Sequence, residues 1–146
     1  MLNFYIYGAK METITITGSR NGKFVYKGDL QISGDLIVAV EELVIEGNIT
    51  VNGNIDAKNL TVTGCINAEN ISADKLVAQN IMVSGTIYAE DIFCNELDAN
   101  TLSAGNIKAK QVAVNNLHCV NLTSDSLTVK SGEFDVVGSL ISRSVR

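Results

Sequence analysis

The sequence predicts an all-β fold, namely a single-stranded parallel β-helix (β-solenoid) of about six turns of 17–21 residues. Three observations predict it: an internal repeat, apolar residues spaced by five or six positions, and frequent corner-forming residues. The chain has 146 residues, 12 of them glycine and none proline. Hydrophobic residues make up 46%, which excludes a disordered tail. A chain of this size forms one compact domain or one short repeat array.

A 21-residue repeat is clearest between residues 60 and 101. Residues 60–80 and 81–101 match at nearly every apolar or glycine position, and residues 102–121 form a third copy that is one residue shorter. The matched pairs are Leu60/Ile81, Val62/Val83, Gly64/Gly85, Ile66/Ile87, Ala68/Ala89, Ile71/Ile92, Leu76/Leu97 and Ala78/Ala99.

The units before this region are shorter. Residues 43–59 form a 17-residue unit, residues 24–42 form another turn, and the stretch after Leu122 forms a final, degraded one. These lengths predict a solenoid over residues 24–141. They also predict that its cross-section flares over the longer units through one extra five-residue side.

Within each unit a large apolar residue is followed two places later by a small one, as in Ile71-x-Ala73 and Leu76-x-Ala78. Residues two apart on a strand point to the same face, whereas residues five apart spread around a helix. Asn, Gly and Asp fill the intervening positions and favour corners. Each turn is therefore predicted to stack short strands about 4.8 Å above the turn below.

The residue that closes each unit is polar: Asn59, Asn80, Thr101 and Asn121. Stacked amide side chains hydrogen-bond along a column and can satisfy backbone groups at corners. We therefore predict that these four residues form one structural ladder rather than a ligand site.

Both ends of the chain carry predictions. Residues 1–23 are predicted to form an N-terminal strand or cap, and residues 142–146 a polar C-terminal tail. The segment Met1–Tyr7 holds three of the chain's Phe and Tyr residues. It is interpreted as a first strand or lid over the core, with a weak peripheral membrane contact as the alternative.

The cysteine count and the hydropathy pattern indicate the compartment. Three cysteines without CxxC spacing fit neither a disulfide framework nor a zinc site. The longest apolar run, Leu36–Val40, is far shorter than the ~20 residues of a bilayer helix, and no signal-peptide pattern opens the chain. We expect a cytoplasmic protein, with the inner membrane face as a peripheral location.

Candidate catalytic residues are sparse. His118, the single histidine, lies between Leu117 and Cys119, so on a strand it is predicted to point outward. Left-handed hexapeptide acyltransferases use a histidine base on a solenoid, but a strict six-residue period is missing here. Cys94 is predicted to occupy the column of Ala73, and Cys119 that of Ala78 and Ala99, as small core residues.

The charged residues indicate a solvated surface. The formal net charge of −5 disfavours a nucleic-acid partner, because phosphate contacts need a basic surface. Acidic residues are predicted at corners or outward positions: Glu69, Asp74, Glu90, Asp91 and Glu96. Asp74 is predicted to alternate along its column with Asn95 and Asn115, which is typical of a solvated face rather than a calcium or glycosidase site. We predict no catalytic, metal-binding or cofactor-binding residues and no cofactor, hence no enzymatic activity.

The repeat steps resemble those of the bactofilins over roughly residues 28–90. The matching motifs are Gly47-Asn48-Ile49, Gly53-Asn54-Ile55, Leu43–Gly47, Leu60–Gly64 and Ile81–Gly85. The resemblance implies a bacterial cytoskeletal β-solenoid that polymerises end to end without nucleotide, often at the inner membrane face. The spacing in the second half is similar to that of pentapeptide-repeat proteins, some of which are acidic DNA mimics.

Two functions remain open from the sequence. The first is a structural scaffold whose partner is itself, as a homo-oligomer or filament formed through exposed solenoid ends. The second is a solenoid with capped ends whose flat face binds a protein or a glycan, the acidic DNA mimics being one such type. The sequence identifies neither the protein partner nor the hand of the solenoid.

Overall fold

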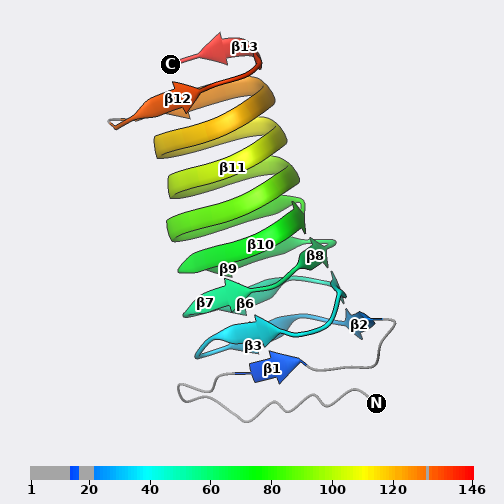
Figure 1. Ribbon diagram of the computed structural model, residues 1–146. Helices are drawn as coiled ribbons and strands as arrows, with labels where there is room; N and C mark the ends of the chain where they lie inside the picture. Colours follow the sequence, from blue (N-terminus) through cyan, green and yellow to red (C-terminus); the bar gives the residue numbers. More distant parts are fainter. Residues whose placement is uncertain (1–13, 17–21, 131) are drawn as a thin grey trace.

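The computed structural model describes residues 14–16, 22–130 and 132–146, and in these ranges it contains strands and no helix (Figure 1). The strands stack in parallel as a β-solenoid of about 7 turns, which confirms the predicted fold class. The bounds are β1 Ile14–Ile16, β2 Lys23–Lys27, β3 Leu30–Ile32, β4 Leu36–Val38, β5 Glu42–Glu46, β6 Ile49–Val51, β7 Asn54–Asp56, β8 Asn59–Val62, β9 Cys65–Ala68, β10 Asn70–Val77, β11 Asn80–Val129, β12 Phe134–Val136 and β13 Leu140–Val145.

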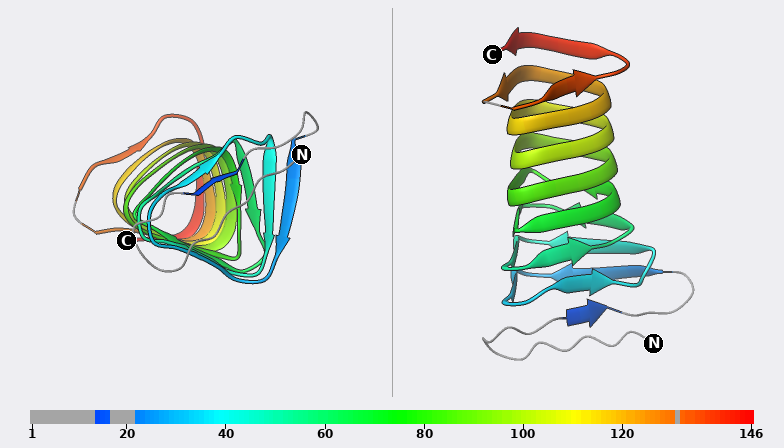
Figure 2. Two further views of the ribbon diagram at one scale, coloured as in Figure 1. Left: turned by 90° about the horizontal axis from the view of Figure 1, so that it is seen from below. Right: turned by 60° about the vertical axis from the view of Figure 1, so that its left-hand side comes forward.

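The strands form three faces around one core, and the outline seen along the axis is a rounded triangle (Figure 2). Face 1 stacks β2, β5 and β8 and continues through β10 and β11 to β13. Face 2 stacks β3, β6 and β9 and continues into β11. Face 3 stacks β1, β4, β7 and β10 and continues through β11 to β12.

One large apolar residue per face and turn points inward and stacks on its counterpart in the next turn. Face 1 carries Leu43, Leu60, Leu76, Ile92, Ile107 and Leu122 in this column. Face 2 carries Leu30, Ile49, Ile66, Ile81, Leu97, Val112 and Leu127, and face 3 carries Leu36, Ile55, Ile71, Ile87, Leu102 and Leu117. All are at most 3% exposed. Burying one such side chain contributes roughly 1.5–3 kcal/mol, so these columns supply most of the driving force.

The turns narrow along the chain, so the predicted flare is wrong. Leu30 pairs with Ile49, an interval of 19, and Leu43 pairs with Leu60, an interval of 17. The interval is 16 at Ile71 and 15 at Ile66, whose partners are Ile87 and Ile81. It lengthens to 17 and 18 only in the last turn, at β12 and β13. The middle of the solenoid is therefore its narrowest part.

The apolar period explains why the 21-residue repeat does not mark a turn. From residue 87 to residue 127 every fifth residue is a column residue, so three five-residue sides complete one 15-residue turn. The 21-residue spacing equals one 16-residue turn plus one further five-residue side. Two residues related by it lie on adjacent faces: Leu60 stacks beneath Leu76 on face 1, whereas Ile81 stacks on Ile66 on face 2.

On faces 1 and 3, the size of the second inward residue of each strand follows the length of the turn. The long early turns place Ile45, Val62 and Val38 there. The 15- and 16-residue turns place small residues there: Ala57, Ala73, Ala78, Ala89, Cys94, Ala104, Ala109, Cys119 and Ser124. A shorter turn encloses less space, so only a small side chain fits without overpacking.

The corners change character with the turn length. Early corners use glycine: Gly47 has φ 156, and a β-carbon there would collide with the carbonyl oxygen of Gly28. Between residues 80 and 129 the corners stay in register with the turns above and below, so β11 runs for 50 residues without a break. A corner of this kind needs no left-handed residue, which leaves its positions free for polar side chains.

Polar ladders connect the turns, although the single predicted ladder is wrong. Asn121 donates to Asn106 Oδ1 (2.8 Å), Asn80 to Cys65 Sγ (3.6 Å), Asn116 to Thr101 Oγ1 (3.3 Å) and Asn59 to the Glu41 carbonyl oxygen (3.0 Å). The four residues predicted to share one column thus belong to ladders on three different faces. The cause is again that the turn is shorter than the 21-residue repeat.

The structure bears on the ends in part. Met1–Tyr7 and most of the predicted cap at residues 1–23 lie outside the described residues, but within that segment β1 pairs with β4. At the other end, β13 includes residues 142–145 of the predicted tail and pairs with β11.

The register can be checked by cross-linking. Ser72 and Tyr88 are paired outward residues of face 3, so the Ser72→Cys/Tyr88→Cys variant should form a disulfide under mild oxidation, detected by peptide mass mapping. In the matched control Ser72→Cys/Phe93→Cys, the two positions are related by the 21-residue repeat and lie on different faces. A disulfide in the control and not in the first variant would contradict the 16-residue turn.

Candidate self-assembly site at the last turn

The last turn is an open edge of the solenoid. Phe134 and Val136 of β12 pair with Leu117 and Cys119, and Leu140 of β13 pairs with Leu122. Within the described ranges no strand pairs with the other side of β12 or β13 (Figure 1). Their outer backbone donors and acceptors are therefore a template for a further strand.

The apolar columns also end uncovered at this turn. Phe134, Leu140 and Val145 occupy the three column positions and are 45%, 38% and 53% exposed. The residues directly beneath them, one turn earlier, are at most 1% exposed. The last turn therefore presents a cross-section of the core to its surroundings.

At the other end, no described strand pairs with the outer side of β1, β2 or β3, but the column residues there are more buried than those of the last turn. Leu30, Ile32 and Leu36 are at most 2% exposed, and β1 stacks beneath β4. Phe24 and Tyr26 are partly buried against the same core. Among the described residues the column residues are thus buried in the first turns and exposed in the last one.

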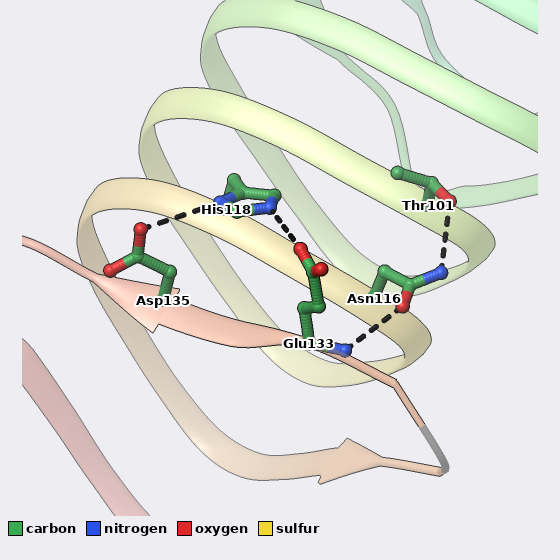
Figure 3. Close-up of polar contacts among 5 residues, drawn as sticks. All are labelled: Thr101, Asn116, His118, Glu133 and Asp135. Atoms are coloured by element: carbon green, nitrogen blue, oxygen red, sulfur yellow. Dashed lines mark hydrogen bonds and ion pairs between the residues drawn. The ribbon is translucent and has the colours of Figure 1, made fainter.

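Polar contacts attach β12 to the turn beneath it (Figure 3). Asn116 continues a ladder: its Nδ2 donates to Thr101 Oγ1, and its Oδ1 accepts from the backbone N–H of Glu133 at 2.9 Å. His118 lies between two carboxylates, with Nε2 3.0 Å from Glu133 and Nδ1 3.5 Å from Asp135. Both contacts are exposed, so each contributes little beyond positioning.

A second set of contacts attaches β13. Asn121 Oδ1 accepts from the Ser139 N–H at 3.1 Å, and Ser124 donates to Ser142 Oγ at 3.1 Å. The backbone of Arg146 donates to the Leu127 carbonyl oxygen (2.8 Å). The apolar surface of the last turn is therefore held in place rather than frayed.

His118 points outward as predicted, and its two partners were not predicted. Glu133 and Asp135 approach different ring nitrogens from the next turn, so they cannot bind one ion together with the imidazole. The thiol of the neighbouring Cys119 points inward, away from the ring, so it is not a nucleophile that the imidazole could activate. The 15-residue turn read from the apolar period would have identified Glu133, whereas Asp135 lies 17 residues after His118 because the last turn is longer.

The three cysteines are free, and the structure places Cys94 and Cys119 inside the solenoid. Their columns differ from the predicted ones, because Cys94 stacks on Ala78 and Cys119 pairs with Val136. Burial raises the pKa of Cys94 to about 12. Burial, with a smaller contribution from the Asp135 carboxylate, raises the pKa of Cys119 to about 11. Both thiols are thus protonated and unreactive near neutral pH.

The acidic residues do not gather into a site. Glu69, Asp74, Glu90 and Glu96 are exposed and Asp91 is half-buried, on several faces and corners. Asp74, Asn95 and Asn115 lie at three different corners, so the predicted shared column is wrong. No group of three or more metal-binding side chains occurs among the described residues. No described segment forms a helix that could cross a membrane.

Comparisons with family models, curated proteins and solved structures give no match to this chain.

Thiol reactivity tests the buried cysteines. In native protein at pH 8, Cys94 and Cys119 should react with iodoacetamide more than about 100-fold more slowly than in denatured protein, because so little thiolate is present. Mass spectrometry of the alkylated peptides measures each site. Raising the pH should accelerate both sites, and Cys119, with the lower pKa, should respond first. Rapid native labelling at pH 8 would contradict their inward placement.

The ladder residue Asn116 is testable by hydrogen exchange. Asn116→Ala removes the acceptor of the Glu133 N–H, so the free energy of opening of β12 should fall by roughly 1 kcal/mol. The backbone amide hydrogens of β12 should therefore exchange faster. Asn95→Ala is a matched control, because its side-chain amide donates to Gln79 on a middle turn, away from β12. Equal effects of the two variants on β12 would show that Asn116 does not hold the last turn.

Proposed function

We propose that this chain is a non-enzymatic structural protein that self-assembles through its solenoid ends, in the manner of the bactofilins. The observation that carries the proposal is the uncovered apolar turn formed by β12 and β13. Covering Phe134, Leu140 and Val145 would remove three large side chains from water and pair two open strand edges.

The surface suits a second copy of the same chain. Its partner must offer a flat cross-section of similar size and unpaired strand backbone, and the end of another solenoid has both. Because the polar contacts from Asn116, His118 and Asn121 fix the last turn, little conformational entropy is lost on association. The Gly-Asn-Ile steps shared with the bactofilins support the same proposal independently.

The alternative is a solenoid that binds a partner through a flat face. The two functions can be distinguished by substituting two neighbouring apolar residues of β13, one at the end surface and one on a flat face. Leu140 belongs to the end surface and is 38% exposed, whereas its neighbour Ile141 projects from face 1 and is 61% exposed.

Electron microscopy of negatively stained protein tests the proposal. Wild-type protein should form filaments, and Leu140→Lys should abolish them, because a buried ammonium group costs several kcal/mol. Ile141→Lys adds the same charge one residue away and should leave filaments intact. Val145→Lys is a second end variant on another face and should act as Leu140→Lys does.

Two results would overturn the proposal. One is discrete single particles for the wild type at every salt concentration. The other is loss of filaments with Ile141→Lys and not with either end variant, which would favour the flat-face function. Circular dichroism of each variant confirms that the solenoid is retained.

A further inference from the structure

Charge is sorted between the faces of the solenoid. Six of the nine described lysines and arginines lie on the strands of face 1: Lys23, Lys27, Lys75, Lys108, Lys110 and Arg143. The same strands carry only four of the fifteen described carboxylates: Glu42, Glu46, Asp91 and Asp125. The other two faces and their corners hold the remaining eleven. A chain of net negative charge thus has one cationic face.

The cationic face has a groove beside an exposed aromatic ring. Phe93 is 40% exposed, and the strand one turn above it carries Lys108 and Lys110. These residues line an open groove of about 540 Å³, which also reaches Asp125. Lys75, one turn below, places its Nζ 5.6 Å from the centre of the Phe93 ring and adds to the positive charge.

Face 2 has a groove of the opposite charge. Met82 is 54% exposed, and the strand one turn above it carries Glu96 and Asp98. These three residues line a groove of about 310 Å³. Lys108, Lys110, Glu96 and Asp98 are all exposed, and none forms an ion pair with another described residue of its own chain.

The two patterns match in register as well as in charge. Each has an apolar residue on the middle line of the face, Phe93 or Met82, and a charged residue directly above it, Lys108 or Asp98. Along the chain Phe93 follows Met82, and Lys108 follows Asp98, by nearly the same interval. Both intervals are about two thirds of a turn, so Phe93 and Lys108 lie higher along the axis than Met82 and Asp98 by about the same distance. Sliding one rod along its axis by that distance brings Phe93 level with Met82 and Lys108 level with Asp98 at once.

The flanking charges follow the same geometry. When two parallel rods place face 1 of one against face 2 of the other, the facing strands run in opposite directions. Lys110, two residues after Lys108, is then opposite Glu96, two residues before Asp98. The exposed ring of Phe93 meets the thioether of Met82, a favourable sulfur–aromatic contact.

We propose that face 1 of one solenoid binds face 2 of a second copy side by side, through Lys108–Asp98, Lys110–Glu96 and Phe93–Met82. The contact is heterologous, so a pair keeps one free face 1 and one free face 2 to which further copies can add, and the row curves because these two faces of a triangular rod are not opposite each other (Figure 2). It involves different residues from the end contact and does not depend on it. Exposed charge pairs are weak individually, so pairing falls as salt screens them.

Sedimentation velocity in an end-blocked background tests this contact alone. The Leu140→Lys chain should self-associate at low salt and dissociate as salt is raised. Adding Lys108→Glu should weaken association by at least roughly tenfold, since it replaces an attraction by a repulsion. Lys130→Glu changes the net charge by the same amount on an exposed residue away from the contact and should leave association unchanged.

Charge exchange provides the decisive measurement. Lys108→Glu and Asp98→Lys chains should each associate poorly alone, and their mixture should recover association, because each then supplies the partner that the other needs. Asp56→Lys changes an exposed residue of face 3 and is the control for Asp98→Lys. A mixture of Asp56→Lys and Lys108→Glu chains should not recover association. Failure of the mixture, or an equal effect of Lys108→Glu and Lys130→Glu, would overturn the lateral contact.

The two proposals fail separately. Filaments from wild-type protein with no side-by-side pairing of end-blocked rods would reject the lateral contact and leave end assembly standing. Salt-sensitive pairing of end-blocked rods, together with the absence of filaments from wild-type protein, would reject end assembly and leave the lateral contact standing.

Discussion

The structure depends on the stacking of one large apolar side chain on its counterpart in the next turn. This contact repeats on three faces, and in the inner turns each Leu or Ile of a column is covered above and below by another large apolar residue. A strand of three to five residues would not be stable alone. Stacked in register, each turn buries the edge and the core of the turn beneath it, so the stability of any turn comes from its neighbours.

The same stacking decides which features of the ends and surfaces are available for binding. Among the described residues the large apolar side chains of the inner turns are buried, and two kinds of surface are well defined: the last layer, where the columns end at Phe134, Leu140 and Val145, and the outward side chains. The end surface is apolar and similar in shape to any internal layer. The flat faces differ from one another only through single outward residues, which is why charge distinguishes face 1 from face 2.

The sequence was sufficient to predict the fold class but not the number of residues in each turn. The alternation in Leu76-x-Ala78 identifies inward strand residues, and it holds throughout the structure. The turn length was mistaken because one five-residue side resembles the next, so the 21-residue similarity is as strong as the similarity between true turns. The better signal was the size of the second inward residue, from Ile45 in a 17-residue turn to Ala109 in a 15-residue one. The partners of His118 were missed for the same reason, since finding Glu133 requires the correct turn length.

The regular turn between residues 80 and 129 makes the length of the rod adjustable in fixed steps. Removing residues 87–101 would bring Leu102 onto Ile71 and keep the remaining column residues on their own faces, with the rod shorter by one strand spacing of about 4.8 Å. Removing one 21-residue repeat would instead rotate everything that follows by one face. Duplication or loss of 15-residue segments is therefore a route by which such a protein can change its length while it keeps its end surface and the alignment of its three faces.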